Sequence, residues 1–242
     1  MVGASGKLGA TVCSLIDSSE QYEVSARIGS KDDLDGMSGA DIVVDVTLPA
    51  ITQEVVAAAV ERGIPVVVGT SGWSADRIET LRRGMPAEGE SGVLIVPNFS
   101  IGSVLATSFA AMAARYFDSI EIVEAHPVSK VDSPSGTAVR TAELIGGARG
   151  ARGPVVAPHV DQRARGQHVS TVPIHSLRME GVVAKQEVLF GGIGELLTVT
   201  HETIDRSAYE AGILLALGAV RDIRGVVVGL DKLIELTPDT EE

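Results

Sequence analysis

The chain has 242 residues, which is enough for one large domain or two modest ones with a buried core. Asp and Glu number 32 against 20 Lys and Arg, and the net charge of −12 argues against nucleic acid or anionic membrane as a general partner. The single cysteine excludes an internal disulfide, and no apolar run approaches membrane-spanning length or forms a leader, so we expect a cytoplasmic protein that does not bind membranes.

A glycine-rich turn opens the chain, with the sequence Gly3-Ala4-Ser5-Gly6-Lys7-Leu8-Gly9. It precedes a helical pattern over 10–16, where glycines let the backbone approach a pyrophosphate at a helix start. The spacing is GxxGxxG rather than the commoner GxGxxG, so the turn is a weak signal that its context strengthens. Only Met1 and Val2 stand where a central strand should lead into the turn, and we therefore expect an upstream start or a clipped chain.

Short runs of branched residues alternate with amphipathic segments up to about residue 100. The expected strands cover residues 23–28, 41–46, 64–68 and 92–96. The expected helices cover residues 51–62, ending at Gly63, and 75–83, capped by Ser74. This alternation predicts an α/β fold, a Rossmann-type doubly wound parallel sheet with helices on both faces.

After the strand expected at 23–28, Arg27, Ser30 and Lys31 stand where an acidic residue usually binds the ribose 2′-hydroxyl of NADH. Cations and a hydroxyl at this place favour the 2′-phosphate of NADPH. A solvated basic turn is the alternative interpretation.

The pattern changes after Pro97, where a second α+β domain with a mixed sheet is expected. The expected elements are a helix over 101–117, a strand over 120–123, a helix ending near 146–147, strands over 170–179, 182–190 and 195–201, a helix over 209–220 and a short strand over 226–228. The arginines of the loop over 146–168 are expected on a solvated face or against a neighbouring subunit; they are Arg149, Arg152, Arg163 and Arg165. We expect a dinucleotide-binding domain at 1–100 and 208–242, and a substrate-binding and oligomerisation domain at 101–207.

The segment from Glu124 to Ala138 is the most informative part of the chain. It combines His126, Lys130 and the turn Ser135-Gly136-Thr137, which opens a helical pattern after a strand. Unpaired backbone N–H groups at a helix start, beside a cation, form an anion site that suits a carboxylate, and a histidine nearby can transfer a proton. An ordinary strand–turn–helix with a surface lysine is the alternative interpretation.

With these residues in view, the chain resembles the 4-hydroxy-tetrahydrodipicolinate reductase (dihydrodipicolinate reductase) family, particularly its actinobacterial members, from Gly3 to about Leu236. The matching motifs are the glycine turn, Asp45-Val46-Thr47-Leu48-Pro49 (D-F-T-x-P), Gly69-Thr70-Ser71-Gly72 (G-T-T-G), Pro97-Asn98-Phe99-Ser100-Ile101-Gly102 (P-N-F-[SA]-x-G) and Glu124 to Ala138 (E-x-H-H-x-x-K-x-D-x-P-S-G-T-A). The last motif is highly specific, whereas the glycine turn is not.

The resemblance implies a homotetrameric oxidoreductase that uses NADPH, with NADH as the alternative, to reduce 4-hydroxy-tetrahydrodipicolinate, a cyclic dicarboxylate, in the diaminopimelate and lysine pathway. His126 falls at the family's proton donor, Lys130 at its catalytic lysine, and Ser135, Gly136 and Thr137 at residues that bind a substrate carboxylate. The implied cofactor residues are Gly3, Ser5, Gly6, Lys7, Leu8, Arg27, Ser30, Lys31, Thr47, Gly69, Thr70, Ser71, Pro97, Asn98 and Phe99. The remaining histidines form no metal-ligand spacing, so no metal is expected.

One departure from the family pattern concerns the substrate. Pro127 replaces the second histidine of the family's pair and Ser129 a further one, while Lys185 stands where actinobacterial relatives often have histidine. Because proline supplies neither an imidazole nor an N–H, one substrate contact is missing. Two alternatives therefore remain open: a paralogue that reduces a related cyclic imine or enamine dicarboxylate, and a non-catalytic nucleotide-binding homologue.

Overall fold

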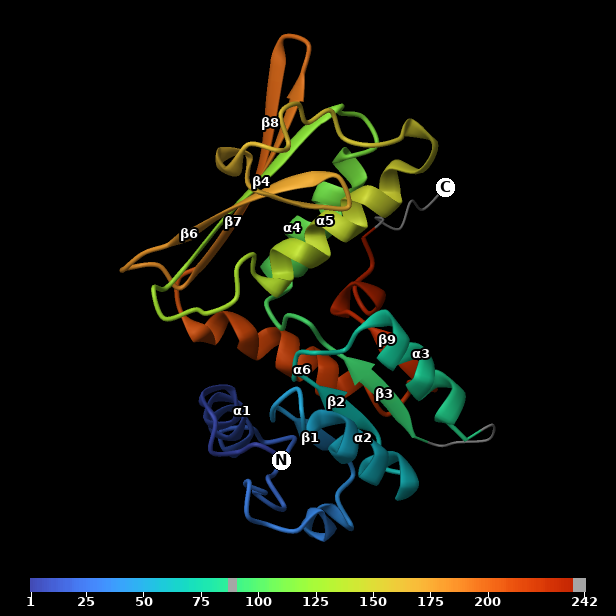
Figure 1. Cartoon of the computed structure of the whole chain (residues 1–242). Coiled ribbons are helices and arrows are strands. Elements are labelled where there is room, and N and C mark those ends of the chain that lie inside the picture. Colours follow the sequence, from blue (N-terminus) through green and yellow to red (C-terminus); the bar gives the residue numbers. More distant parts are fainter. Residues whose placement is uncertain (87–90, 237–242) are drawn as a thin grey trace, which may run out of the picture. The chain divides into compact units, whose positions relative to one another are not determined.

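The computed structural model describes residues 1–86 and 91–236, and the chain divides into two compact units, each built around its own sheet (Figure 1). The first unit comprises Met1–Phe99 and Tyr209–Glu242, and the second comprises Ser100–Ala208. The predicted fold class, a doubly wound parallel sheet together with a mixed sheet, is confirmed.

The first unit contains a four-stranded parallel sheet in the order β1-β2-β3-β9. Its strands are β1 (Val43–Asp45), β2 (Val66–Val68), β3 (Gly92–Ile95) and β9 (Gly225–Val228). Successive residues of β2 point to opposite faces, and Val66, Val67 and Val68 are all buried. Both faces of the sheet are therefore covered, as is usual for parallel sheets.

The α-helices in the described part of this unit are α1 (Lys7–Asp17), α2 (Thr52–Glu61), α3 (Ala75–Gly84) and α6 (Glu210–Ala219). Val55, Val56 and Ala59 of α2 pack in one core with β2 and β3, and α1 contacts α6. Gly63, with a φ of +69°, ends α2, and the Ser74 hydroxyl caps α3 by accepting from the Arg77 N–H. The bounds predicted for α2 and α3 agree with the structure to within one residue, because Gly63 marks the end of the first and Ser74 the start of the second. The helix predicted at 10–16 is longer, since α1 spans Lys7–Asp17.

The strand predicted at 23–28 is wrong in extent. Only Ile28 forms a bridge, to Val2, which also bridges Asp45. Val2 donates to the Val44 carbonyl and Gly3 to the Ile28 carbonyl, so Val2 lies between Ile28 and β1. A strand needs a neighbour to supply its ladder of hydrogen bonds, and here that neighbour is only Met1 and Val2.

The second unit contains a five-stranded mixed sheet in the order β5-β6-β4-β7-β8. Its elements are α4 (Ile101–Ala113), β4 (Ser119–His126), α5 (Gly136–Arg149), β5 (Gln167–Val169), β6 (Val172–Arg178), β7 (Ala184–Gly192) and β8 (Glu195–Thr203). Of the neighbouring pairs, β4 and β6 run parallel and the others antiparallel. Figure 1 shows α4 and α5 along one side of this sheet, where their small residues pack against Ile120, Ile122 and Phe190.

Short 3₁₀ turns complete the chain at Leu34–Met37, Gly150–Arg152, Arg163–Arg165, Arg206–Tyr209 and Leu230–Lys232. Two predicted boundaries are corrected in the second unit. The helix α4 ends at Ala113 rather than at 117, and α5 continues through Gly146 and Gly147 to Arg149. At Gly146 an added Cβ would meet the Ser170 side chain at 2.8 Å, so this glycine permits close packing instead of ending the helix.

Arg149 is buried, which corrects its expected place on a solvated face. Its guanidinium donates to the carbonyls of Ala114, Phe117, Gly153 and Pro154. Several donors on one planar group satisfy carbonyls that would otherwise be buried without partners, and this compensates for burying the charge.

Candidate active site

The segment that carries His126 and Lys130 joins the end of β4 to the start of α5 in the second unit. His126 is the last residue of β4, and Ser135 is the N-cap of α5, whose hydroxyl accepts from the Ala138 N–H at 3.3 Å. Ser135 is buried, whereas Gly136 is exposed and Thr137 is half-buried. A Cβ added at Gly136 would meet nothing within 4 Å, so space is open at this helix start. The geometry suits a bound anion.

A buried carboxylate holds His126. Glu124 Oε2 lies 2.5 Å from His126 Nδ1, and both carboxylate oxygens of Glu124 accept from Arg178 at 3.0 Å. Glu124 and His126 are two residues apart on β4, and the parallel register places Arg178 beside His126. Glu124 Oε1 also accepts from the Ser135 N–H at 3.2 Å, so one carboxylate contacts both the histidine and the cap of α5.

Lys130 lies in the turn after β4, where its N–H donates to the Pro127 carbonyl at 3.0 Å. Its ammonium is 2.8 Å from Asp132 Oδ1, and both side chains are partly exposed. Lys185 is not part of this group. It pairs with Ala125, its side chain lies on the sheet face opposite to that of Glu124, and its ammonium contacts Glu187 at 2.8 Å.

The surroundings shift two pKa values in this site. Burial lowers the pKa of His126 below its ordinary value, and Lys130 and Arg178 add to the effect, while the hydrogen bond and charge of Glu124 oppose it. Burial raises the pKa of Glu124, but hydrogen bonds from Arg178, Ser176 and His126 outweigh it, so this pKa lies below its ordinary value. The carboxylate is therefore ionised near neutral pH and can only accept, so His126 Nδ1 is the donor.

In the first unit, Gly3 and Gly9 of the glycine turn occupy positions that do not tolerate a side chain. Gly3 has a φ of +86°, and a Cβ there would lie 2.6 Å from the Val46 carbonyl oxygen. Gly9 packs against the Gly3 carbonyl without room for a side chain. Gly6 is the N-cap of α1 and has no side chain to cap the first amides of this helix. An anion such as a pyrophosphate fits such a place.

The other predicted cofactor residues of this unit lie at the same edge, where the parallel strands end. Thr47 follows β1, Gly69, Thr70 and Ser71 follow β2, and Pro97, Asn98 and Phe99 follow β3. The structure therefore brings together the glycine turn and the three predicted loops at the carboxyl ends of the strands, the usual ligand edge of such folds.

The buried Asp45 connects two of these loops. Its carboxylate accepts from the Thr47 hydroxyl at 2.6 Å and from the Thr52 hydroxyl, and its carbonyl accepts from the Gly69 N–H at 2.8 Å. Phe99 packs on Gly69, where a Cβ would meet its ring at 2.6 Å.

The basic residues expected near a 2′-phosphate are less closely grouped than the loops at the carboxyl ends of the strands. Arg27 lies 2.6 Å from Asp17, the last residue of α1 and thus at the end of that helix away from the glycine turn. Ser30 and Lys31 are exposed in the loop after Ile28. Asp32 Oδ2 accepts from the Gly29 N–H at 2.8 Å, which puts a carboxylate at the end of this segment.

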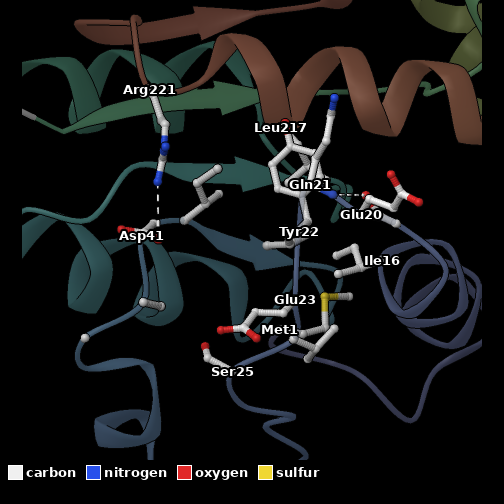
Figure 2. A pocket seen from close by; sticks show the side chains of 16 residues that line it. Met1, Ile16, Glu20, Gln21, Tyr22, Glu23, Ser25, Asp41, Leu217 and Arg221 are labelled. Atoms are coloured by element: carbon white, nitrogen blue, oxygen red, sulfur yellow. Dashed lines mark hydrogen bonds and ion pairs between the residues drawn. The ribbon is translucent and has the colours of Figure 1, made fainter.

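A cavity of about 610 Å³ lies elsewhere in the first unit (Figure 2). Its walls include Met1, Tyr22, Leu217 and the ion pair Arg221–Asp41 at 3.2 Å. Residues 39–42 precede β1, so this cavity belongs to the amino-terminal edge of the sheet, away from the predicted cofactor residues. Within residues 1–86 and 91–236, no cluster of three or more potential metal ligands occurs, and none of the helices is long and apolar enough to cross a membrane.

Sequence reasoning assigned no role to Glu124, Arg178 or Asp45. The spacing of Glu124 and His126 was a usable signal, because residues two apart in a strand share a face. The partnership with Arg178 spans 54 residues and depends on the register of β4 and β6, which no local pattern reveals.

Comparisons with known proteins cover both units. Residues 1–99 match the family described as dihydrodipicolinate reductase, N-terminus, and residues 102–234 match dihydrodipicolinate reductase, C-terminus. The chain is 63% identical over 241 residues to 4-hydroxy-tetrahydrodipicolinate reductase of Clavibacter michiganensis subsp. michiganensis, covering 100% of this chain and 87% of that protein. It is 41% identical to the reductase of the same name from Mycolicibacterium smegmatis, covering 98% of each.

Among solved structures, a dipicolinate-bound dihydrodipicolinate reductase from Paenisporosarcina sp. TG-14 has 28% identity and a TM-score of 0.80, covering 96% of this chain and 97% of that one. A myo-inositol 2-dehydrogenase from Lactobacillus plantarum shares only the fold, with 11% identity, a TM-score of 0.58, and coverage of 98% and 90%.

Proposed function

The chain belongs to the dihydrodipicolinate reductase family, and we propose that it catalyses the NAD(P)H-dependent reduction of 4-hydroxy-tetrahydrodipicolinate to tetrahydrodipicolinate in the diaminopimelate and lysine pathway. One observation carries the proposal beyond family membership. A histidine supported by a buried carboxylate, a lysine and an open helix start occur together at the carboxyl end of β4. These three elements suit a dicarboxylate that takes up a proton during reduction, since they supply an anion site, a positive charge and a proton donor.

The first unit holds the cofactor in this proposal. The amides at the start of α1, with Gly3, Ser5, Gly6, Lys7 and Leu8, receive the pyrophosphate, since the turn leaves room for a close approach of the backbone. The other predicted residues of this unit, Thr47, Gly69, Thr70, Ser71, Pro97, Asn98 and Phe99, surround the rest of the molecule. When bound, the nicotinamide supplies the hydride for the reduction.

The second unit binds the substrate and handles the proton. The N–H groups of Gly136 and Thr137, with the Ser135 turn, bind one substrate carboxylate, and Lys130 adds a positive charge. His126 donates the proton from Nε2, because Nδ1 already donates to Glu124. A donor near the carbon that takes up negative character during reduction speeds the reaction.

NADPH is the preferred cofactor in this proposal, with NADH also accepted. Arg27, Ser30 and Lys31 can bind a 2′-phosphate. The ion pair between Arg27 and Asp17 competes only weakly with that contact. Both side chains of that pair are about half exposed, and exposed ion pairs contribute little to stability, so Arg27 can exchange partners. Asp32 beside Gly29 favours a ribose hydroxyl, which is why a bias is expected instead of exclusive use.

A homotetramer is also part of the proposal. In the second unit, α4 and α5 cover one face of the sheet, while Leu177 and Leu196 on the other face are exposed. Apolar side chains on an uncovered sheet face favour burial against another subunit.

The runner-up function rests on Pro127. The family's second imidazole is absent here, and the ammonium of Lys185 is paired with Glu187 at 2.8 Å. This favours a paralogue that reduces a related cyclic imine or enamine dicarboxylate. The intact group of His126, Lys130 and the α5 start argues against a non-catalytic homologue.

An assay of NADPH oxidation distinguishes these functions. The substrate is made in situ by the preceding synthase, and reactions without the synthase serve as the control. Turnover that requires the synthase, and that the planar dicarboxylate dipicolinate inhibits, supports the proposal. Absence of turnover with this substrate, together with turnover of a related cyclic imine dicarboxylate, would establish the paralogue instead.

A further inference from the structure

Both carboxylate oxygens of Glu124, next to His126, accept hydrogen bonds. The Glu124 side chain is 0% exposed, and its two oxygens accept from His126, from both terminal nitrogens of Arg178 and from the Ser135 N–H. A buried carboxylate without partners is strongly unfavourable, so this arrangement exists only as a complete set.

We propose that Glu124 is the positioning residue of the reaction: it fixes the ring of His126 with Nδ1 as donor, leaves Nε2 to exchange the proton with the substrate, and stabilises the imidazolium form. This inference rests on the proposed function of the same site. The geometry is that of a carboxylate–histidine pair, in which the bond at one ring nitrogen determines what the other can do.

Arg178 completes the pair from the neighbouring strand. Its two contacts with Glu124 at 3.0 Å hold the carboxylate in one orientation, and it also donates to the Asp132 carbonyl at 2.5 Å in the turn that carries Lys130. Because Glu124 also accepts from the Ser135 N–H, the proton donor and the carboxylate-binding turn are held by one side chain. A shift of Glu124 therefore disturbs both parts of the site together.

The charges around His126 predict opposite effects for the two supporting residues. Glu124 raises the pKa of His126, whereas Arg178 and Lys130 lower it. On the neighbouring strand β7, the residue opposite Glu124 is the neutral Gln186, which is hydrogen-bonded to Thr141. Removing the charge of Glu124 should thus lower the pKa of His126, and removing that of Arg178 should raise it.

The test is an NMR titration of His126 in Glu124→Gln and Arg178→Gln, together with the pH dependence of kcat/KM. The chain has five histidines, and the His126→Gln variant assigns the signal of interest. In Glu124→Gln we expect the His126 midpoint to fall by about one pH unit or more, and kcat/KM above that midpoint to fall about tenfold or more. In Arg178→Gln the midpoint should rise.

Glu121→Gln is the matched control. Glu121 is on the same strand but on the opposite face, where it accepts from Arg165 and lies 2.6 Å from His175 Nε2. This variant should leave the His126 titration and kcat unchanged.

A merely structural role for Glu124 predicts movement of the His126 midpoint in the same direction in both test variants, and that result would overturn the inference. An unchanged midpoint in Glu124→Gln would overturn it as well. Because the titration needs no substrate, it tests the positioning role of Glu124 even if the assay with the proposed substrate shows no turnover. Should Glu124→Gln fail to fold, the sign of the Arg178→Gln shift decides the question.

Discussion

Replacing His126 with glutamine is the sharpest single test of the proposed mechanism. Glutamine keeps hydrogen-bonding capacity near Glu124 but loses the titratable proton. A positioned general acid contributes about 10²–10⁴-fold to the rate, and we expect kcat to fall within this range. KM should change much less, because Lys130 and the start of α5 still hold the substrate carboxylates.

The pH dependence follows from the surroundings of His126. Burial, with Lys130 and Arg178, lowers its pKa below the ordinary value of 6.5. The imidazolium fraction of the free wild-type enzyme is therefore smaller at a given pH than that of an ordinary histidine. Wild-type kcat/KM should fall about tenfold per pH unit well above the pKa of His126, and the difference between wild type and variant should shrink as the pH rises.

The assay measures initial rates of NADPH oxidation as a function of pH, with substrate made in situ. His175→Gln is the control, because it removes a histidine that pairs with a different carboxylate, Glu121. If His126→Gln kept the wild-type kcat and the alkaline fall while Lys130→Ala was inactive, Lys130 would be the proton donor and the assignment of His126 would be wrong.

Lys130→Ala should raise KM for the substrate as well as lower kcat, because its charge acts on bound substrate and transition state alike; steady-state kinetics check this, and an unchanged KM would contradict it. Arg27→Ala/Lys31→Ala should raise KM for NADPH while leaving that for NADH nearly unchanged, and equal effects on both would refute a 2′-phosphate contact. Arg149→Met should lower the free energy of unfolding by about 2–4 kcal/mol in urea denaturation, since four carbonyls lose their donor, whereas Met at the exposed Arg163 should have little effect.

The fold of the first unit was predictable because each element carries its own signal. The runs of valine at β1 and β2 read as strands, and the glycine and serine at the helix ends give the boundaries. Since parallel strands end at one edge, placing the loops after each strand also predicts that Thr47, Gly69 and Phe99 gather there. The predicted strand at 23–28 failed because its partner comprises only Met1 and Val2.

The interior of the second unit was less predictable because its polar contacts are long-range. Composition suggests that Arg149 is solvated, yet the carbonyls it satisfies include Ala114 and Phe117, more than thirty residues away. Likewise, Glu124 and Arg178 meet only through the register of β4 and β6. A local pattern shows that charged residues occur, but not which of them the topology buries together.

Pro127 fits the backbone of the fold, although it lacks the imidazole that the family pattern has at this position. The strand β4 ends at His126, whose carbonyl still accepts from the Met179 N–H at 3.0 Å, so the missing N–H of Pro127 falls beyond the last ladder bond. Its carbonyl accepts from the Lys130 N–H, which closes the turn that presents the lysine. Proline is therefore compatible with the fold. If the proposed function holds, we expect the loss of the imidazole contact to weaken substrate binding by about 1.5–3 kcal/mol, or roughly tenfold to a hundredfold in affinity. Its effect should consequently appear in KM and in the choice between related dicarboxylates, while the proton transfer by His126 remains.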